Sequence, residues 1–187
     1  MIRPEDPDRI FGEGGAQEAM LEAKKAGKIR YVGFTGHKDP FIHLRMLKIA
    51  AESHFHFDAV QMPLNVMDAH FRSFEDQVLP VLLKGGIGVE AMKTFGDNFV
   101  LRSKTVQPIE ALHYSMTLPT SVVITGIDNS GVLNQAIEAV RTFKPMTKDE
   151  IANLLGRTRA AAATGQFELY KVSQHFDGTA HNPQWLG

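Results

Sequence analysis

Four polar side chains lie at or just after the ends of short apolar segments of the kind that form strands. They are Thr35, Gln61, Lys93 and Asn129, which together offer a hydroxyl, two amides and an ammonium group. An amide can both donate and accept hydrogen bonds, whereas an ammonium only donates and carries a charge. Because a strand end needs no buried polar side chain for stability, four such residues in a row favour a site at this end of the strands. Binding sites of parallel barrels lie at this carboxyl end of the strands.

Histidine offers a second kind of chemistry, because the chain contains eight of them. His54 and His56 are two residues apart, so on a strand they would point to one face, as metal ligands can. They precede their predicted strand, however, and so lie at the end opposite to the polar residues above. We therefore favour a polar corner over a metal site. His37 is the better candidate for a site residue, the alternative being an ordinary residue of the turn before Asp39.

The composition excludes several classes of function. The chain has 187 residues with 20 basic and 21 acidic side chains, so its net charge of −1 favours neither nucleic acid nor an anionic membrane as partner. The absence of cysteine excludes disulfides, thiolate metal sites and cysteine nucleophiles. No apolar run approaches the ~18 residues of a membrane span. The charged, proline-containing residues 1–8 are not typical of a signal peptide, so we expect a cytoplasmic protein.

Helix and strand signals alternate along the chain. Residues 17–26 are strong helix formers with Gly27 just after them, and Asp39-Pro40 supplies an N-cap and a first helical residue. Residues 121–125 form an apolar run that suits a strand buried on both faces. The signals predict strands over 28–35, 57–62, 87–92 and 121–125, and helices over 17–26, 40–53, 74–84, 108–116, 131–143 and 147–163.

This alternation with short connections indicates an α/β fold with a parallel sheet built from right-handed crossovers. The chain shows no repeat and no linker, so we expect one domain over 1–187. Its βα core would cover about 15–143, and a C-terminal helix and tail about 147–187. Four strands could form a small open sheet or half of a closed barrel, since a complete (β/α)8 barrel usually needs about 250 residues.

Several segments, in this order, resemble the C-terminal half of the aldo-keto reductases. They are residues 22–37 (EAKKAGKIRYVGFTGH), 60–65 (VQMPLN), 88–96 (GVEAMKTFG) and 120–129 (TSVVITGIDN). The resemblance implies four βα units of a TIM-type (β/α)8 barrel, a half-barrel, plus an extra C-terminal helix and tail. It also implies an oxidoreductase that uses NADP or NAD, bound across the carboxyl ends of the strands, and a small-molecule carbonyl substrate, an aldehyde or ketone.

The resemblance assigns the nicotinamide end of this cofactor to the first two strands. Thr35 and Gln61 match the residues that hold the nicotinamide carboxamide, and an amide suits a group with the same donors and acceptors. Gly36 and His37 follow where many relatives have asparagine, so one donor is lost or replaced by His37. Met92 stands where many relatives place an aromatic ring, and methionine can offer a softer surface there.

The resemblance assigns the phosphate and adenosine end to the last two strands. Lys93 and the following residues 94–96 would border the pyrophosphate. Gly126, Asp128 and Asn129 would approach the adenosine ribose, and Gln135 would lie near the adenine. Relatives that prefer NADPH carry Lys or Arg around this last loop for the 2′-phosphate. Asp128 would repel that phosphate and could accept from a free 2′-hydroxyl, so the sequence leaves NAD and NADP open.

No residue of the chain matches the proton donor of the family. In the relatives a tyrosine, tuned by a lysine and an aspartate, acts as general acid beside a histidine, and all four belong to the first half of the barrel. The three tyrosines here, Tyr31, Tyr114 and Tyr170, lack the spacing of that motif. We therefore predict no catalytic residue, expect the chain to be N-terminally incomplete relative to the family, and expect negligible carbonyl reduction by the chain alone.

Two alternatives stay open. The first is a non-catalytic half-barrel that self-associates, since the two unpaired edges of an open sheet promote pairing and a homodimer could rebuild eight strands. The second, less favoured, is a metal-dependent barrel hydrolase that uses His54 and His56.

Overall fold

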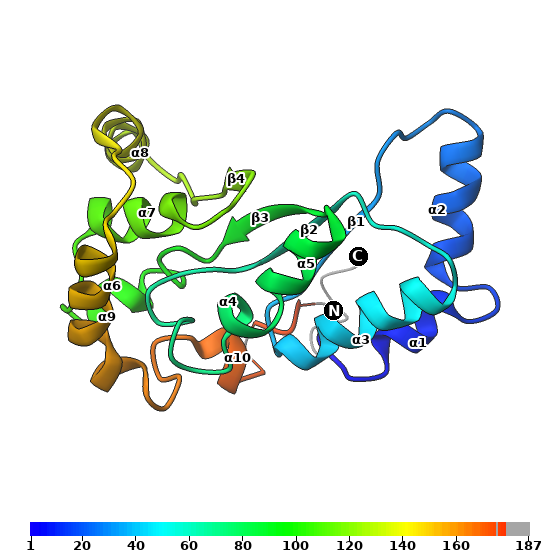
Figure 1. Cartoon of the computed structure of the whole chain (residues 1–187), viewed down its shortest axis with the longest axis horizontal. Coiled ribbons are helices and arrows are strands. Elements are labelled where there is room, and N and C mark those ends of the chain that lie inside the picture. The colour runs from blue at the N-terminus through cyan, green and yellow to red at the C-terminus, as the bar shows by residue number, and fades with distance from the viewer. Residues whose placement is uncertain (175, 179–187) are drawn as a thin grey trace.

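A computed structural model describes residues 1–174 and 176–178. Its four strands form one parallel sheet in the order β1-β2-β3-β4, in the middle of the molecule (Figure 1). The sheet is not closed, so β1 and β4 are its edges. This arrangement confirms the predicted α/β fold of four parallel units. The strands are β1 (Gly33–Thr35), β2 (Ala59–Pro63), β3 (Gly88–Met92) and β4 (Val122–Val123).

Both edge strands are shorter than the sequence predicts. β1 covers only the end of the predicted segment 28–35, and β4 covers two residues of the segment 121–125. Ser121 and Ile124 still donate to carbonyls of β3 at 2.7 and 2.8 Å, so the pairing extends slightly beyond β4. The prediction of a strand buried on both faces is wrong here, because Val122 is 50 % exposed. An edge strand has hydrogen-bonding partners on one side only, which shortens the ordered ladder.

The five longest helices lie where the sequence predicts them, each within one residue at either end. Their first turns explain the agreement: the Asp39 carboxylate accepts from the Phe41 amide at 2.9 Å, and Thr147 forms a capping box with Glu150. None of the helices in the described part of the chain is long and apolar enough to cross a membrane. The helices are α2 (Ala16–Lys25), α3 (Pro40–Glu52), α7 (Pro108–Thr117), α8 (Ser130–Thr142) and α9 (Lys148–Ala162).

The predicted helix over 74–84 is in fact two helices, α4 (Phe74–Gln77) and α5 (Leu79–Gly85). Pro80 has no amide hydrogen and its ring clashes with the preceding turn, which ends α4 before it. Gly86 then ends α5 in the left-handed conformation, at φ +65°.

Three short helices have no counterpart among the sequence predictions. They are α1 (Asp6–Phe11), α6 (Phe99–Arg102) and α10 (Leu169–Val172). Helices of four to six residues are too short to show a periodic pattern, so contacts with the rest of the molecule must hold them.

One face of the sheet is covered and the other is open. Val60 and Met62 of β2, with Val89 and Ala91 of β3, are at most 1 % exposed and pack against α4 and α5. Side chains alternate between the two faces of a strand, so Gln61, Glu90 and Met92 point to the opposite face and stay partly exposed.

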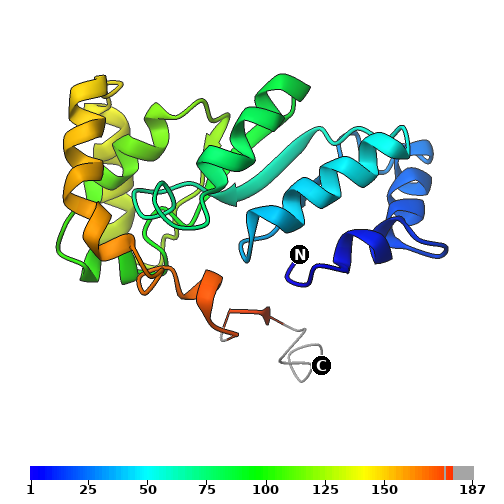
Figure 2. The ribbon, with the colours of Figure 1, turned by 60° about the horizontal axis from the view of Figure 1, so that its bottom comes forward.

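The C-terminal segment returns across the strand ends. In both views it leaves α9 and runs as α10 below the sheet toward the N-terminal part of the chain (Figures 1 and 2). A buried ionic cluster holds it there. The Lys171 ammonium lies 2.6 Å from the Asp68 carboxylate and 3.0 Å from the Glu168 carboxylate, and all three side chains are buried.

Candidate functional site

A groove of about 560 Å³ crosses the carboxyl ends of β2 and β3 and reaches the start of α8. We call it the strand-end groove; it is lined by Gln61, by residues 92–98 and Leu101, and by residues of the segment 124–135. Seven of the ten predicted site residues line it: Gln61, Met92, Lys93, Gly126, Asp128, Asn129 and Gln135. The structure therefore brings most of the predicted site together, while their binding of a cofactor stays a prediction.

Thr35 is joined to this groove through Gln61. The parallel register of β1 and β2 places the two residues opposite each other, and the Thr35 hydroxyl donates to Gln61 Oε1 at 3.0 Å. This bond leaves the Gln61 Nε2 hydrogens free to donate and the Thr35 oxygen free to accept. The pair can thus offer a donor and an acceptor to one amide group.

Lys93 supplies the positive charge of the groove. It adopts a left-handed backbone conformation at φ +59°, and its carbonyl accepts from Asn65 Nδ2 at 3.0 Å. Its ammonium lies 5.7 Å from the ring centre of Tyr170 and 5.3 Å from that of Phe176, both in the C-terminal segment. Among the described residues that line the groove, Lys93 alone has a basic side chain.

The far end of the groove is acidic. Asn129 is the N-cap of α8: its Oδ1 accepts from the Val132 amide at 3.0 Å, and its Nδ2 donates to Asp128 Oδ1 at 2.7 Å. These bonds hold the exposed Asp128 carboxylate beside the start of the helix. A carboxylate is favoured there by the partial positive charge of the helix N-terminus.

Part of the loop after β3 was not among the predicted site residues. Asp97 and Asn98 line the groove and follow Gly96, and all three adopt positive φ angles of 62°, 66° and 52°. A Cβ on Gly96 would lie 2.9 Å from Val100 and 3.1 Å from the Phe167 carbonyl, so this position requires glycine. A run of Gly, Asp and Asn, which tolerate the left-handed region best, is the sequence signal that could have marked this loop.

Gly36 and His37 lie beside the end of β1 and are not part of the groove lining. The His37 ring contacts the ring of Tyr170, with 5.8 Å between their centres. Burial, and then the nearby charge of Lys93, lower the pKa of His37 to about 4, so its ring is neutral at pH 7. The next residue, Lys38, binds the Asp177 carboxylate at 2.8 Å and fixes the C-terminal segment beside His37.

None of the three tyrosines is placed to donate a proton in the groove. Tyr114 donates to Glu75 at 2.6 Å and Tyr170 donates to Glu168, and both are buried. Burial, and then these carboxylates, raise the pKa of both hydroxyls, the opposite of what a proton donor at neutral pH requires. Tyr31, 70 % exposed, precedes β1 and so lies toward the amino ends of the strands.

His54 and His56 are exposed in the corner before β2, away from the groove. Within residues 1–174 and 176–178, no group of three or more His, Asp or Glu side chains is arranged to hold a metal ion.

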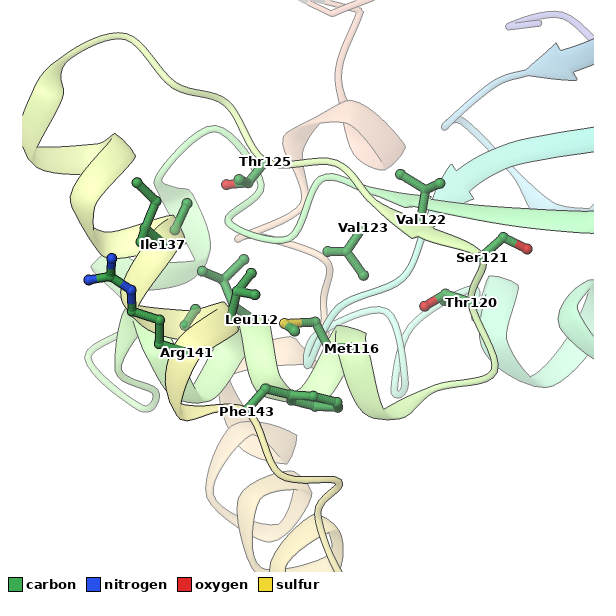
Figure 3. A pocket seen from close by; sticks show the side chains of 13 residues that line it. Leu112, Met116, Thr120, Ser121, Val122, Val123, Thr125, Ile137, Arg141 and Phe143 are labelled. Carbon is green, nitrogen blue, oxygen red and sulfur yellow. The ribbon is translucent and has the colours of Figure 1, made fainter.

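A second hollow, of about 670 Å³, lies at the free edge of β4 (Figure 3). It is mostly apolar, with Leu112 and Met116 of α7, Val123 of β4, Ile137 of α8 and Phe143 around it. None of the predicted site residues lines this hollow.

No protein-family model and no curated protein matches the sequence. The structure, however, is similar to solved aldo-keto reductases. The holo form of AKR11C1 from Bacillus halodurans gives a TM-score of 0.55 at 15 % identity, over 75 % of this chain and 54 % of that chain. The apo form gives a TM-score of 0.56 at 14 % identity, over 75 % of this chain and 55 % of that chain. The thermostable aldo-keto reductase Tm1743, in complex with the inhibitor epalrestat, gives 0.52 at 15 %, over 75 % of this chain and 53 % of that chain. The chain thus spans about half the length of these structures. It has the fold of part of an aldo-keto reductase barrel, in a sheet that is not closed.

Proposed function

We propose that the chain binds a nicotinamide adenine dinucleotide, NAD or NADP, in the strand-end groove, as part of an oxidoreductase that acts on aldehydes, ketones or alcohols. The observation that carries this proposal is the meeting of the Thr35–Gln61 pair, Lys93 and the loop from Gly126 to Asn129 along one groove. The groove lies at the carboxyl ends of parallel strands, where barrel proteins bind their ligands. The likeness of the fold to aldo-keto reductases supports the same conclusion.

The donors and acceptors of the groove fit the chemical groups of such a dinucleotide. Thr35 and Gln61 offer the acceptor and the donor that a carboxamide needs. Lys93 offers one cation for a diphosphate, and Met92 offers a polarisable surface for an aromatic ring. The groove volume of about 560 Å³ lies within the range of small-molecule sites. When bound, the dinucleotide would supply the hydride; the residues of this chain would orient it.

Proton donation is a separate requirement. Because both buried tyrosine hydroxyls are bound to carboxylates, we propose that this chain holds the cofactor without reducing carbonyls at an appreciable rate. General acid catalysis typically contributes about 10²–10⁴-fold. Turnover of a simple aldehyde clearly above that of a boiled sample would contradict this part of the proposal.

Equilibrium titration of NADH, followed by its fluorescence, tests the binding. We expect saturable binding by the chain and binding about tenfold weaker after Gln61→Leu, which removes about one hydrogen bond's net contribution. Gln166→Leu is the matched control, because Gln166 is exposed and lies outside the groove. The absence of saturable binding, or an equal loss in both variants, would contradict the proposal.

A second candidate function, self-association as a homodimer, is favoured by a different observation. Two helices bury few of their side chains: α2 has no buried residue, and only Ala139 of α8 is buried. A copy whose β1 lay beside β4 would cover the apolar hollow of Figure 3 and extend the parallel sheet. The two candidates are compatible, because the strand-end groove lies within one copy.

A further inference from the structure

We propose that the strand-end groove selects NAD(H) over NADP(H), and that Asp128 is the residue that discriminates between them. This inference rests on the proposed function, because it concerns which dinucleotide the groove accepts.

The order of groups along the groove fixes which end meets the adenosine. The proposed function assigns the carboxamide to the Thr35–Gln61 pair, and Gln61 lies at one end of the groove. Lys93 comes next and offers a cation for the diphosphate, the one basic side chain among the described residues of the lining. The adenosine ribose then lies against the remaining end, which Gly126, Asp128 and Asn129 form at the start of α8.

NADP differs from NAD by one phosphate on that ribose, so the charge at this end decides the preference. The Asp128 carboxylate is exposed, and Asn129 Nδ2 holds it in place at 2.7 Å. It already supplies the negative charge that the start of α8 favours, and Asn129 Oδ1 already accepts the Val132 amide. A phosphate here would therefore meet a fixed carboxylate, and the Val132 amide is already occupied.

The rest of the groove offers no compensation. Its lining residues include one basic side chain, Lys93, against two acidic ones, Asp97 and Asp128. The single cation is already matched to the diphosphate. A free 2′-hydroxyl, in contrast, can donate a hydrogen bond to the Asp128 carboxylate, as in other dinucleotide sites.

Dissociation constants of NADH and NADPH, measured by fluorescence titration, test the inference. We expect the chain to bind NADH at least about tenfold more tightly than NADPH. The ratio of the two dissociation constants should fall at high salt, since salt screens repulsion between exposed charges. Asp128→Asn should reduce the ratio of the NADPH to the NADH dissociation constant several-fold, mainly because NADPH binds more tightly to the variant. Glu138→Gln is the matched control: it removes the same charge from α8 outside the groove and should leave the ratio unchanged.

Each outcome separates the two proposals. NADPH binding as tight as NADH, or a ratio that Asp128→Asn leaves unchanged, overturns this inference and leaves the proposed function standing. An equal effect of Asp128→Asn and Glu138→Gln assigns the preference to net charge and overturns the role of Asp128. If neither dinucleotide shows saturable binding, the proposed function fails, and this inference fails with it.

Discussion

Lys93 adopts a backbone conformation that few residues other than glycine adopt, and its neighbours hold it there. Asn65 binds its carbonyl, and the same Asn65 amide donates to the Tyr170 hydroxyl at 3.0 Å, while the Tyr170 ring lies below its ammonium. A residue held at positive φ by its surroundings is a common feature of ligand sites. The position of this cation in the groove therefore depends on a tyrosine that is 77 residues away in the sequence.

Removing the charge of Lys93 should weaken dinucleotide binding. We expect Lys93→Met to weaken NADH binding by about tenfold and to make the remaining binding less sensitive to salt, because an ion pair with the diphosphate is lost. The measurement is the NADH titration at low and at high ionic strength. Lys84→Met, at an exposed position in the last turn of α5, should change neither value. A salt dependence that persists in Lys93→Met would show that this lysine does not bind the phosphates.

His43 should make the stability of the chain depend on pH. Burial lowers its pKa to about 3, only partly opposed by the Gln61 backbone, so the ring stays neutral in the core between Phe34 and Phe74. In the unfolded chain the ring takes up a proton near pH 6.5. Below that pH the unfolded state binds more protons, and the free energy of unfolding falls. From pH 7 to pH 5 the loss should be about 2 kcal/mol.

A variant isolates this contribution. The buried carboxyls of Asp68 and Glu168, whose pKa burial raises, change stability in the opposite direction over an overlapping range. The free energy of unfolding is therefore measured in urea at pH 7 and at pH 5, for the unchanged chain and for His43→Leu. The contribution of His43 is the difference between the two chains in the loss on acidification. We expect the variant to lose about 2 kcal/mol less on acidification. An equal loss in both chains would refute the assignment to His43.

At the scale of elements, α10 is a short helix that carries Tyr170, the ring beside the Lys93 ammonium. Four residues cannot form a stable helix alone, so the buried contacts of Lys171 with Asp68 and Glu168 must fix it. Asp68 in turn accepts the amides of Phe74 and Glu75 at the start of α4. One ammonium thus ties the C-terminal segment to the helix that covers the sheet.

Removing this ammonium should destabilise the whole chain. Lys171→Met leaves two carboxyl groups buried without a cation, and breaking a buried ion pair from one side costs about 3–5 kcal/mol. Urea unfolding followed by circular dichroism measures the loss. Lys144→Met, at an exposed position between α8 and α9, should change the free energy of unfolding by less than about 0.5 kcal/mol. A loss in Lys171→Met as small as in that control would contradict the role of the cluster.

The elements also show what the sequence can predict. The five long helices were predictable because each has a length, a cap or a stop signal of its own, such as Asp39 before α3. The lengths of β1 and β4 were not predictable in this way, because a strand extends only where a neighbouring strand pairs with it. Gln61 and Lys93 were predictable as strand-end polar residues, whereas Asn129 is the N-cap of α8, six residues after β4. The contact between the Tyr170 ring and the Lys93 ammonium was not predictable, because only the folded chain brings these two residues together.

At the scale of the whole molecule, the open sheet leaves apolar surface at β4 and α8. Val122 is 50 % exposed and Val140 is 66 % exposed, beside the hollow of Figure 3. Unpaired edge strands promote association unless charge or a covering segment protects them. In a twofold dimer, β4 of each copy would lie beside β1 of the other, and eight parallel strands would close around a common axis.

This arrangement predicts a dimer that a single charge at the edge disrupts. In sedimentation velocity at micromolar concentration we expect the chain to be dimeric and Val122→Lys to be monomeric. Val122 is in register with Glu90 and points to the open face of the sheet, so a closed barrel would bury the lysine in its interior. Val81→Lys is the matched control, because Val81 is 42 % exposed on α5, away from both edges, and should stay dimeric. A stable monomer of the unchanged chain would contradict the twofold closure. Larger species that grow with concentration would contradict it too, because they would show that the edges pair in open chains.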